Sequence, residues 1–334
     1  MKIALVCGGP SSEHEVSLKS TEAILKNIDK SKYEIFIFYI DKDLRSCFFL
    51  PKKERLDIPT DKGLYVPLLQ GIKEGLKQCD LAVLMGIHGE FAEDGRLQSL
   101  LDFHQVPYTG SGADSSALAM DKFVSTNLIE HILHLKIPRT FLIDVTNNVE
   151  LPRIEYPIVV KPNSAGSSVG VYIVNSPNEL DGILAGAKLE SKFRYWLVQD
   201  YIQDAIEISC GCLQDKKTRS FTSLPPIEII QQTSRFFDYS AKYQLGGSRE
   251  IVPPKNIPGH ISETISNLAC DIHELLRCRT YSRSDFLVKD GEIYYLETNT
   301  LPGMTQASLL PQEAGAVGIS FRQLIDFVIE KSKP

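Results

Sequence analysis

The sequence predicts a mixed α/β and α+β protein, with a parallel α/β domain first and two α+β parts after it. Its 334 residues are enough for two or three domains. Near the beginning, a strand-like run, a helix-like run and a second strand-like run follow one another, which indicates a βαβ unit with parallel strands. Near the end, two β-branched and aromatic runs flank Asp290-Gly291, which predicts a β-hairpin. These observations set the fold class.

The first domain is expected to be an N-terminal α/β domain over residues 1–112. Apolar runs bounded by glycine predict strands, and apolar residues at helical spacing predict helices. The predicted elements are strands over 2–9, 33–40, 81–89 and 106–112, and helices over 12–28 and 95–105.

The second and third domains are expected over 113–200 and 201–334. In the second, we expect a helical stretch over 113–135, two strands joined by a Gly/Ser loop over 156–174, a helix over 177–188 and a strand over 195–202. In the third, we expect short strands, a polar loop over 236–250, a helix over 261–278, the hairpin over 281–299 and an amphipathic helix over 320–332.

Composition excludes several classes of protein. The net charge of −6 argues against a nucleic-acid-binding protein, which needs a basic face. No apolar run approaches the roughly 18 residues of a membrane span, so we expect no membrane association. The first residues are expected to form a strand and not a signal peptide. The seven cysteines are scattered without metal spacing, so we expect reduced thiols and a cytoplasmic location.

The hairpin carries a candidate metal site. Glu297 and Asn299 alternate along a strand and therefore share a face, and Asp285 begins the partner strand. Oxygen ligands without His or Cys suit Mg²⁺, and Arg283 beside them suits a phosphate or an oxyanion. A two-residue turn would put Asp285 and Glu297 on opposite faces, so we expect a three-residue loop or a β-bulge. The alternative is a solvated polar face.

Two loops are further candidates. The Gly/Ser segment 162–170 follows Lys161 and could bring backbone N–H groups to phosphate oxygens, or it could be an ordinary hairpin loop. The polar loop over 236–250 contains Lys242 and Tyr243, and its length indicates either a lid or a surface connection.

Three more residues have both a functional and a structural interpretation. Glu15 follows the first strand at a helix start, where α/β proteins bind ligands, but Ser12 and Glu15 also have capping-box spacing. His88 follows a later strand and is more often structural than catalytic in such a place. Lys122 lies in a predicted helix, where lysines are commonly exposed.

Together these motifs resemble the D-alanine–D-alanine ligase family of the ATP-grasp superfamily. The resemblance rests on Lys122, on Lys161 with its loop, on the Ala-Lys-Tyr lid over 241–243 and on the hairpin with the segment that follows it. It covers almost the whole chain, with all motifs in order. It implies that residues 1–112 form a substrate-binding, pre-ATP-grasp domain, followed by a two-part ATP-grasp fold.

The resemblance also implies ligands. ATP would bind between the second and third domains, and Asp285, Glu297 and Asn299 would hold two Mg²⁺ ions, with Mn²⁺ as a substitute. The ATP-binding residues implied by the family are Lys122, Lys161, Ser167, Ser168, Gln199, Glu207 and Lys242. The family often has Glu where Gln199 stands, and Ala92 departs from its commoner HGxxGEDG motif.

For the substrates, the resemblance implies that Glu15, helped by His88, receives the ammonium of the first D-alanine. Arg283 and the Gly303 N–H would form the oxyanion site, and Ser308 would hold the carboxylate of the second D-alanine. In addition, the lid would be held shut by hydrogen bonds among Tyr243, Ser167 and Glu15.

We therefore expect ATP-dependent joining of two D-alanines through an acyl phosphate, as a step in peptidoglycan precursor synthesis. A homodimer is expected from the resemblance alone. One alternative is a ligase that takes D-lactate or D-serine as second substrate. Another is a non-catalytic ATP-binding module, against which the intact set of Arg283, Asp285, Glu297 and Asn299 argues.

Overall fold

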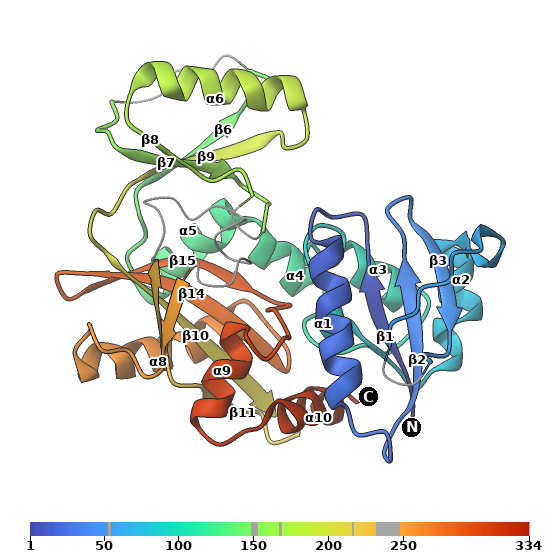
Figure 1. The fold of residues 1–334 in the computed structure, drawn as a ribbon. Helices are drawn as coiled ribbons and strands as arrows, with labels where there is room; N and C mark the ends of the chain where they lie inside the picture. Colours follow the sequence, from blue (N-terminus) through green and yellow to red (C-terminus); the bar gives the residue numbers. More distant parts are fainter. Residues whose placement is uncertain (53–54, 148–152, 167–168, 216, 232–247, 334) are drawn as a thin grey trace.

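The computed structural model describes residues 1–52, 55–147, 153–166, 169–215, 217–231 and 248–333. Three sheets organise these residues, and each sheet draws its strands from one of the three expected domains (Figure 1). The exact boundaries at 112 and 200 remain a prediction. None of the helices in the described ranges combines the length and apolar character that a membrane span requires.

The first sheet has the order β4-β3-β2-β1-β5, and its strands β2, β1 and β5 are parallel to one another. The expected βαβ unit is confirmed. Strands β3 and β4, on the other side of the sheet, pair antiparallel, which was not expected. The connection from β2 to β3 is short, and a short connection permits only antiparallel pairing. The strands are β1 (Lys2–Gly8), β2 (Glu34–Ile40), β3 (Arg45–Phe49), β4 (Val66–Pro67) and β5 (Leu81–Val83).

Helices and turns complete this first part. The short strand expected before the Gly/Ser turn within 106–112 is reduced to an isolated parallel bridge between Tyr108 and Ala82. The helices are α1 (His14–Asn27), α2 (Leu68–Glu74) and α3 (Arg96–Phe103), with short 3-10 turns η1 (Lys62–Leu64), η2 (Leu76–Gln78) and η3 (Leu84–Gly86).

The second sheet has the order β6-β9-β7-β8, and its three strand pairs are antiparallel. Helix α6 covers one face of it (Figure 1), where Leu180 and Ala187 pack on apolar residues of the strands. Two helices lead into this sheet from the first. The elements are α4 (Ala113–Met120), α5 (Lys122–Leu133), β6 (Thr140–Asp144), β7 (Ile158–Pro162), β8 (Tyr172–Val174), α6 (Pro177–Glu190) and β9 (Tyr195–Asp200).

The third sheet has the order β13-β12-β10-β14-β15, and β11 pairs with β10. One face packs on α8, since Ile208 of β10 and Phe286 of β14 share a core with Ile265 of α8. The elements are β10 (Ile206–Asp215), β11 (Ser220–Ser223), β12 (Ile227–Gln231), β13 (Ser248–Ile251), α8 (Gly259–Leu275), β14 (Tyr281–Lys289), β15 (Glu292–Asn299), α9 (Leu309–Ala316) and α10 (Phe321–Ser332).

The expected β-bulge is confirmed in the β14–β15 hairpin. Lys289 pairs with Glu292 around a two-residue turn, and the register then shifts between Asp285 and Phe286. Beyond the shift, Asp285 stands opposite Glu297. The bulge therefore brings the two carboxylates to one face, as the candidate metal site requires.

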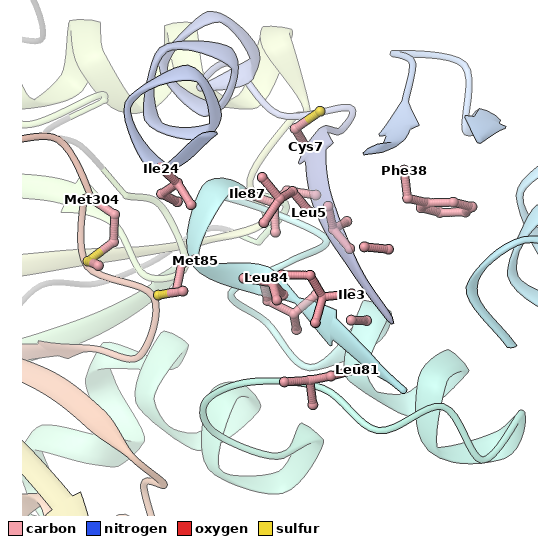
Figure 2. Packing of buried hydrophobic residues seen from close by; sticks show 14 of the residues in the cluster. Ile3, Leu5, Cys7, Ile24, Phe38, Leu81, Leu84, Met85, Ile87 and Met304 are labelled. Carbon is pink, nitrogen blue, oxygen red and sulfur yellow. The ribbon is translucent and has the colours of Figure 1, made fainter. Parts of the chain in front are cut away.

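One apolar core joins distant parts of the chain. Figure 2 shows Met304, from the segment after the third sheet, in the same cluster as Met85 and Ile24 of the first part. Leu324 of α10 belongs to this cluster too and is fully buried. The first sheet and the C-terminal helices are thus held together by shared apolar contacts.

Candidate active site

Lys122 and Glu297 connect the helical stretch to the hairpin. The Lys122 ammonium lies 3.1 Å from Glu297 Oε2 and donates to the Ala165 carbonyl at 2.6 Å. Lys122 is buried, in contrast to the exposed helix lysine that its position also allowed. Asp121 fixes the start of α5 by accepting a hydrogen bond from the Val124 N–H. The Lys122 ammonium therefore connects three segments, namely the start of α5, the loop after β7 and strand β15.

Asp285 and Arg283 form a bidentate ion pair on the same face of β14. Arg283 Nε and Nη2 donate to the two carboxylate oxygens of Asp285 at 2.9 and 2.8 Å. Ser209, directly opposite on β10, donates to the same carboxylate. Burial alone would lower the pKa of Arg283, but the adjacent Asp285 outweighs it and the net shift is upward. Asn299 Oδ1 accepts from the Leu301 N–H at 2.8 Å.

Glu313 adds a carboxyl group that sequence reasoning missed. It lies on α9, is fully buried, and accepts a hydrogen bond from the Gly211 N–H at 2.8 Å. Its other oxygen has no hydrogen-bond partner among the residues that the structure describes. Burial raises the pKa of Glu313 to about 8, and Arg283 acts in the opposite direction. A single glutamate within the apolar run after Ser308 was the only signal in the sequence.

A second group of acids lies in the first part of the chain. Glu93 accepts from the Gly89 N–H at 2.9 Å, and His88 Nδ1 is 3.9 Å from Glu93 and 3.1 Å from the Leu301 carbonyl. Burial, together with the nearby charge of Glu13, raises the pKa of Glu93 to about 8. Burial also lowers the pKa of His88, so this imidazole is held in its neutral form.

The structure distinguishes Glu15 from the neighbouring acid Glu13. Helix α1 begins at His14 with Glu13 at the N-cap position, and no side chain caps this helix, so the capping-box interpretation is wrong as well. Glu15 is exposed, whereas Glu13 is buried. The Glu13 carboxylate lies against Gly166, where an added Cβ would come within 2.9 Å of Oε1. Glu13, two positions earlier, is therefore the acid of this helix start that lies beside the loop after β7.

Gly303 and Ser308 form a tight turn before α9. Ser308 is the N-cap residue of α9, and its hydroxyl accepts from the Thr305 N–H at 3.1 Å. A Cβ at Gly303 would meet this hydroxyl at 2.9 Å. Because Gly303 lacks a side chain, its backbone can approach Ser308, and the two predicted substrate groups lie together.

Three of the predicted ATP-binding residues lie on strands of the second and third sheets. Lys161 is half-buried on β7, and Gln199 is buried on β9, where its Nε2 donates to Thr140 at 2.8 Å. Glu207 is half-buried on β10 opposite Leu287. The predicted residues Ser167, Ser168, Lys242 and Tyr243 lie outside the described residues.

Comparisons with known proteins match both the N-terminal and the C-terminal parts of the chain to one family. A model described as D-ala D-ala ligase N-terminus matches residues 2–111, and one described as D-ala D-ala ligase C-terminus matches residues 140–330. The chain belongs to the D-alanine–D-alanine ligase family. Among curated members of this family, the D-alanine–D-alanine ligase of Clostridium botulinum (strain Alaska E43 / Type E3) is 35% identical, over 99% of this chain and 98% of the relative. That of Bacillus anthracis is also 35% identical, over 99% and 97%.

Solved structures of ligases support the same membership and the ATP-grasp fold. The Bacillus anthracis D-alanine–D-alanine ligase complexed with ATP has a TM-score of 0.77 at 31% identity, covering 99% of this chain and 97% of that one. The VanG D-Ala:D-Ser ligase of Enterococcus faecalis has a TM-score of 0.81 at 28% identity, covering 99% of each chain. The expected fold class is therefore confirmed.

Proposed function

We propose that this protein is an ATP-dependent, ADP-forming ligase that joins two D-alanines to D-alanyl-D-alanine for peptidoglycan precursor synthesis. The observation that carries the proposal is the full-length family match combined with the meeting of Lys122, Arg283, Asp285 and Glu297 in one region. A non-catalytic module would have no use for both a carboxylate pair and two cations there, of which Lys122 is buried and Arg283 nearly so.

The oxygen donors fit divalent metal ions by their chemistry. Asp285 and Glu297 face each other across the hairpin, and Asn299 adds an amide oxygen. We propose that these three residues hold two Mg²⁺ ions, with Mn²⁺ as a substitute. When bound, such ions neutralise the charge of the transferred phosphoryl group. Lys122 and Arg283, which pair with the carboxylates in this structure, would then turn to phosphate and oxyanion oxygens.

The proposed ATP site lies between the second and third sheets. Lys161 would contact the phosphates, and Gln199 and Glu207 would bind the nucleoside. The proposal also includes four residues that lie outside the described residues. ATP would be bound by Ser167, Ser168 and Lys242, and the lid would be held closed by Tyr243. Acyl phosphates hydrolyse readily, so exclusion of water is a requirement of the reaction.

For the first D-alanine, Glu13 replaces Glu15 in our proposal. Its buried carboxylate beside neutral His88 suits an ammonium group, because a buried charge needs a charged partner. Arg283 and the Gly303 N–H would stabilise the tetrahedral oxyanion formed when the second amine attacks the acyl phosphate. Ser308, at a helix N-terminus, would hold the carboxylate of the second D-alanine.

The direct test is to measure ADP, phosphate and dipeptide together, with ATP, Mg²⁺ and D-alanine. We expect equal amounts of the three products. Removal of the metal with a chelator should stop all three, and added Mg²⁺ should restore them. ATP binding without product formation would instead support the non-catalytic alternative.

A D-serine ligase is the second candidate, favoured by the TM-score of 0.81 to the VanG D-Ala:D-Ser ligase. The same assay with D-alanine limiting and either D-serine or D-lactate in excess separates the candidates. We expect D-alanyl-D-alanine to predominate. A larger yield of the mixed product would overturn the choice of second substrate but not the ligase assignment. We also propose that the enzyme works in the cytoplasm, where ATP is supplied, as a homodimer.

A further inference from the structure

Two cysteines meet on the face of the third sheet that points away from the proposed active site. Cys212 lies on β10 opposite Ser282, whose hydroxyl bonds His273 of α8, and Cys270 lies on α8 itself. Their Sγ atoms are 3.3 Å apart, although the residues are 58 positions apart in sequence. Neighbouring residues of β10 on the opposite face, Ser209 and Gly211, belong to the site.

The two thiols differ in exposure and in acidity. Cys212 is 1% exposed, whereas Cys270 is only half-buried and is the one cysteine of the seven that is not buried. The Cys212 thiol donates a hydrogen bond to the Cys270 sulfur, which lowers the pKa of Cys270. Cys270 is thus the thiol that a small oxidant can reach and the one more readily deprotonated.

We propose that Cys270 and Cys212 form a peroxide-reactive modification site, with Cys270 as the attacking thiol and Cys212 as its resolving partner. The Cys270 thiolate attacks a hydroperoxide, which releases water or an alcohol and leaves a sulfenic acid on Cys270. The Cys212 sulfur then attacks the sulfenic sulfur and expels a second water. Overall, two thiols lose two protons and two electrons to the hydroperoxide, and one S–S bond forms.

The cross-link would tie α8 to the centre of β10. A disulfide requires an S–S distance of about 2.05 Å, so the two sulfurs must approach by about 1.2 Å from their present contact. Side-chain rotation can supply such a movement, because Cys270 lies on the partly exposed side of α8. Closing a loop of this length restricts the unfolded chain, so the oxidised protein should unfold at a higher temperature.

The test is to treat the full-length protein with hydrogen peroxide, block the remaining thiols, and map peptides without reduction. We expect a peptide pair linked through Cys212 and Cys270, lost on addition of dithiothreitol, and a Tm higher by several degrees than that of the reduced protein. Cys212→Ser should show sulfenic or higher acids at Cys270 and no cross-link. Cys270→Ser should leave Cys212 unoxidised.

Cys278→Ser is the matched control. Cys278 is buried, and its sulfur accepts a hydrogen bond from the Ser115 hydroxyl at 3.5 Å, so this variant should form the cross-link as the wild type does. The proposal is overturned if Cys270 stays reduced when other cysteines oxidise, or if the main cross-link joins a different pair. An unchanged Tm with the cross-link in place would overturn its role as a tie between α8 and β10.

Discussion

At the residue scale, the start of α1 decides which of two carboxylates faces the site. The segment 11–15 contains two acids, Glu13 and Glu15, and the sequence pattern is compatible with either of them facing the site. The helix begins one residue later than a capping box at Ser12 would require, which leaves Glu13 buried and Glu15 exposed. Helix boundaries are uncertain by one or two residues in sequence reasoning, and here such an error changes the site.

This correction gives a matched pair of variants. Glu13→Gln should lower kcat/KM for D-alanine by roughly 10- to 100-fold, because a charge-assisted hydrogen bond to the substrate ammonium becomes a neutral one. Glu15→Gln should stay within about twofold of the wild type, since an exposed carboxylate is solvated. Steady-state kinetics with D-alanine varied at saturating ATP measures both. The reverse order of effects would restore Glu15 to the site.

Glu313 should make stability depend on pH. Its folded pKa of about 8 lies above the ordinary value of 4.5, so between these pH values the folded chain holds a proton that the unfolded chain has lost. The contribution of protonated Glu313 to the free energy of unfolding is complete below about pH 4.5. It is lost as pH rises through 8, by at most about 1.4 kcal/mol per pH unit.

Glu313→Gln removes this titration while keeping an oxygen for the Gly211 N–H. Urea unfolding at pH 5.5 and pH 8 should therefore show a smaller decrease in the free energy of unfolding for the variant. Equal decreases in both proteins would mean that Glu313 is ionised throughout this range.

At the scale of elements, local patterns predicted the hairpin in detail but not the edge of the first sheet. The β-bulge could be predicted from the alternation of side chains along a strand. Asp285 and Glu297 can share a face across a two-residue turn only if one strand has one extra residue between them and the turn. The antiparallel strands β3 and β4 gave weak signals, since Arg45–Phe49 is short and half-exposed in part. Short strands take their identity from their neighbours in the sheet more than from their own residues.

The contact between α9 and β10 depends on Gly211. A Cβ there would meet Leu310 Cδ1 at 2.4 Å and Glu313 Oε2 at 2.6 Å, so Gly211→Ala must displace the ends of these two buried side chains of α9. We expect a loss of about 1–3 kcal/mol in the free energy of unfolding and a higher KM for the second D-alanine, because Ser308 begins α9. Urea unfolding and D-alanine kinetics measure the two effects.

Gly315→Ala is the matched control for this helix. Nothing lies within 4 Å of a Cβ at Gly315, and alanine favours a helix over glycine. This variant should be neutral or slightly more stable, with unchanged kinetics. Similar losses in both variants would show that α9 tolerates no change at all, and the close approach at Gly211 would lose its explanation.

At the scale of the whole molecule, the sequence predicted separate domains but not the core that joins them. Each apolar run was readable on its own. Local sequence patterns do not predict that Met304 packs with Met85 or that α10 packs on α1. Such contacts join residues more than two hundred positions apart. The site depends on the same long-range order, since His88 bonds the Leu301 carbonyl and Lys122 pairs with Glu297.

This shared core leads to a prediction about cooperativity. Leu324 is 0% exposed on α10, and Leu324→Ala should cost about 2–5 kcal/mol by removing buried methyl groups and leaving a cavity. Because the cavity opens into the core of the first sheet, amide protection from hydrogen exchange should fall in β1 as well as in α10. Leu189→Ala, at a side chain 86% exposed on α6, should leave both unchanged. Hydrogen exchange followed by mass spectrometry resolves the two segments. If protection falls in α10 alone while β1 keeps wild-type rates, the first sheet is stable without its C-terminal partner, and the two parts unfold independently.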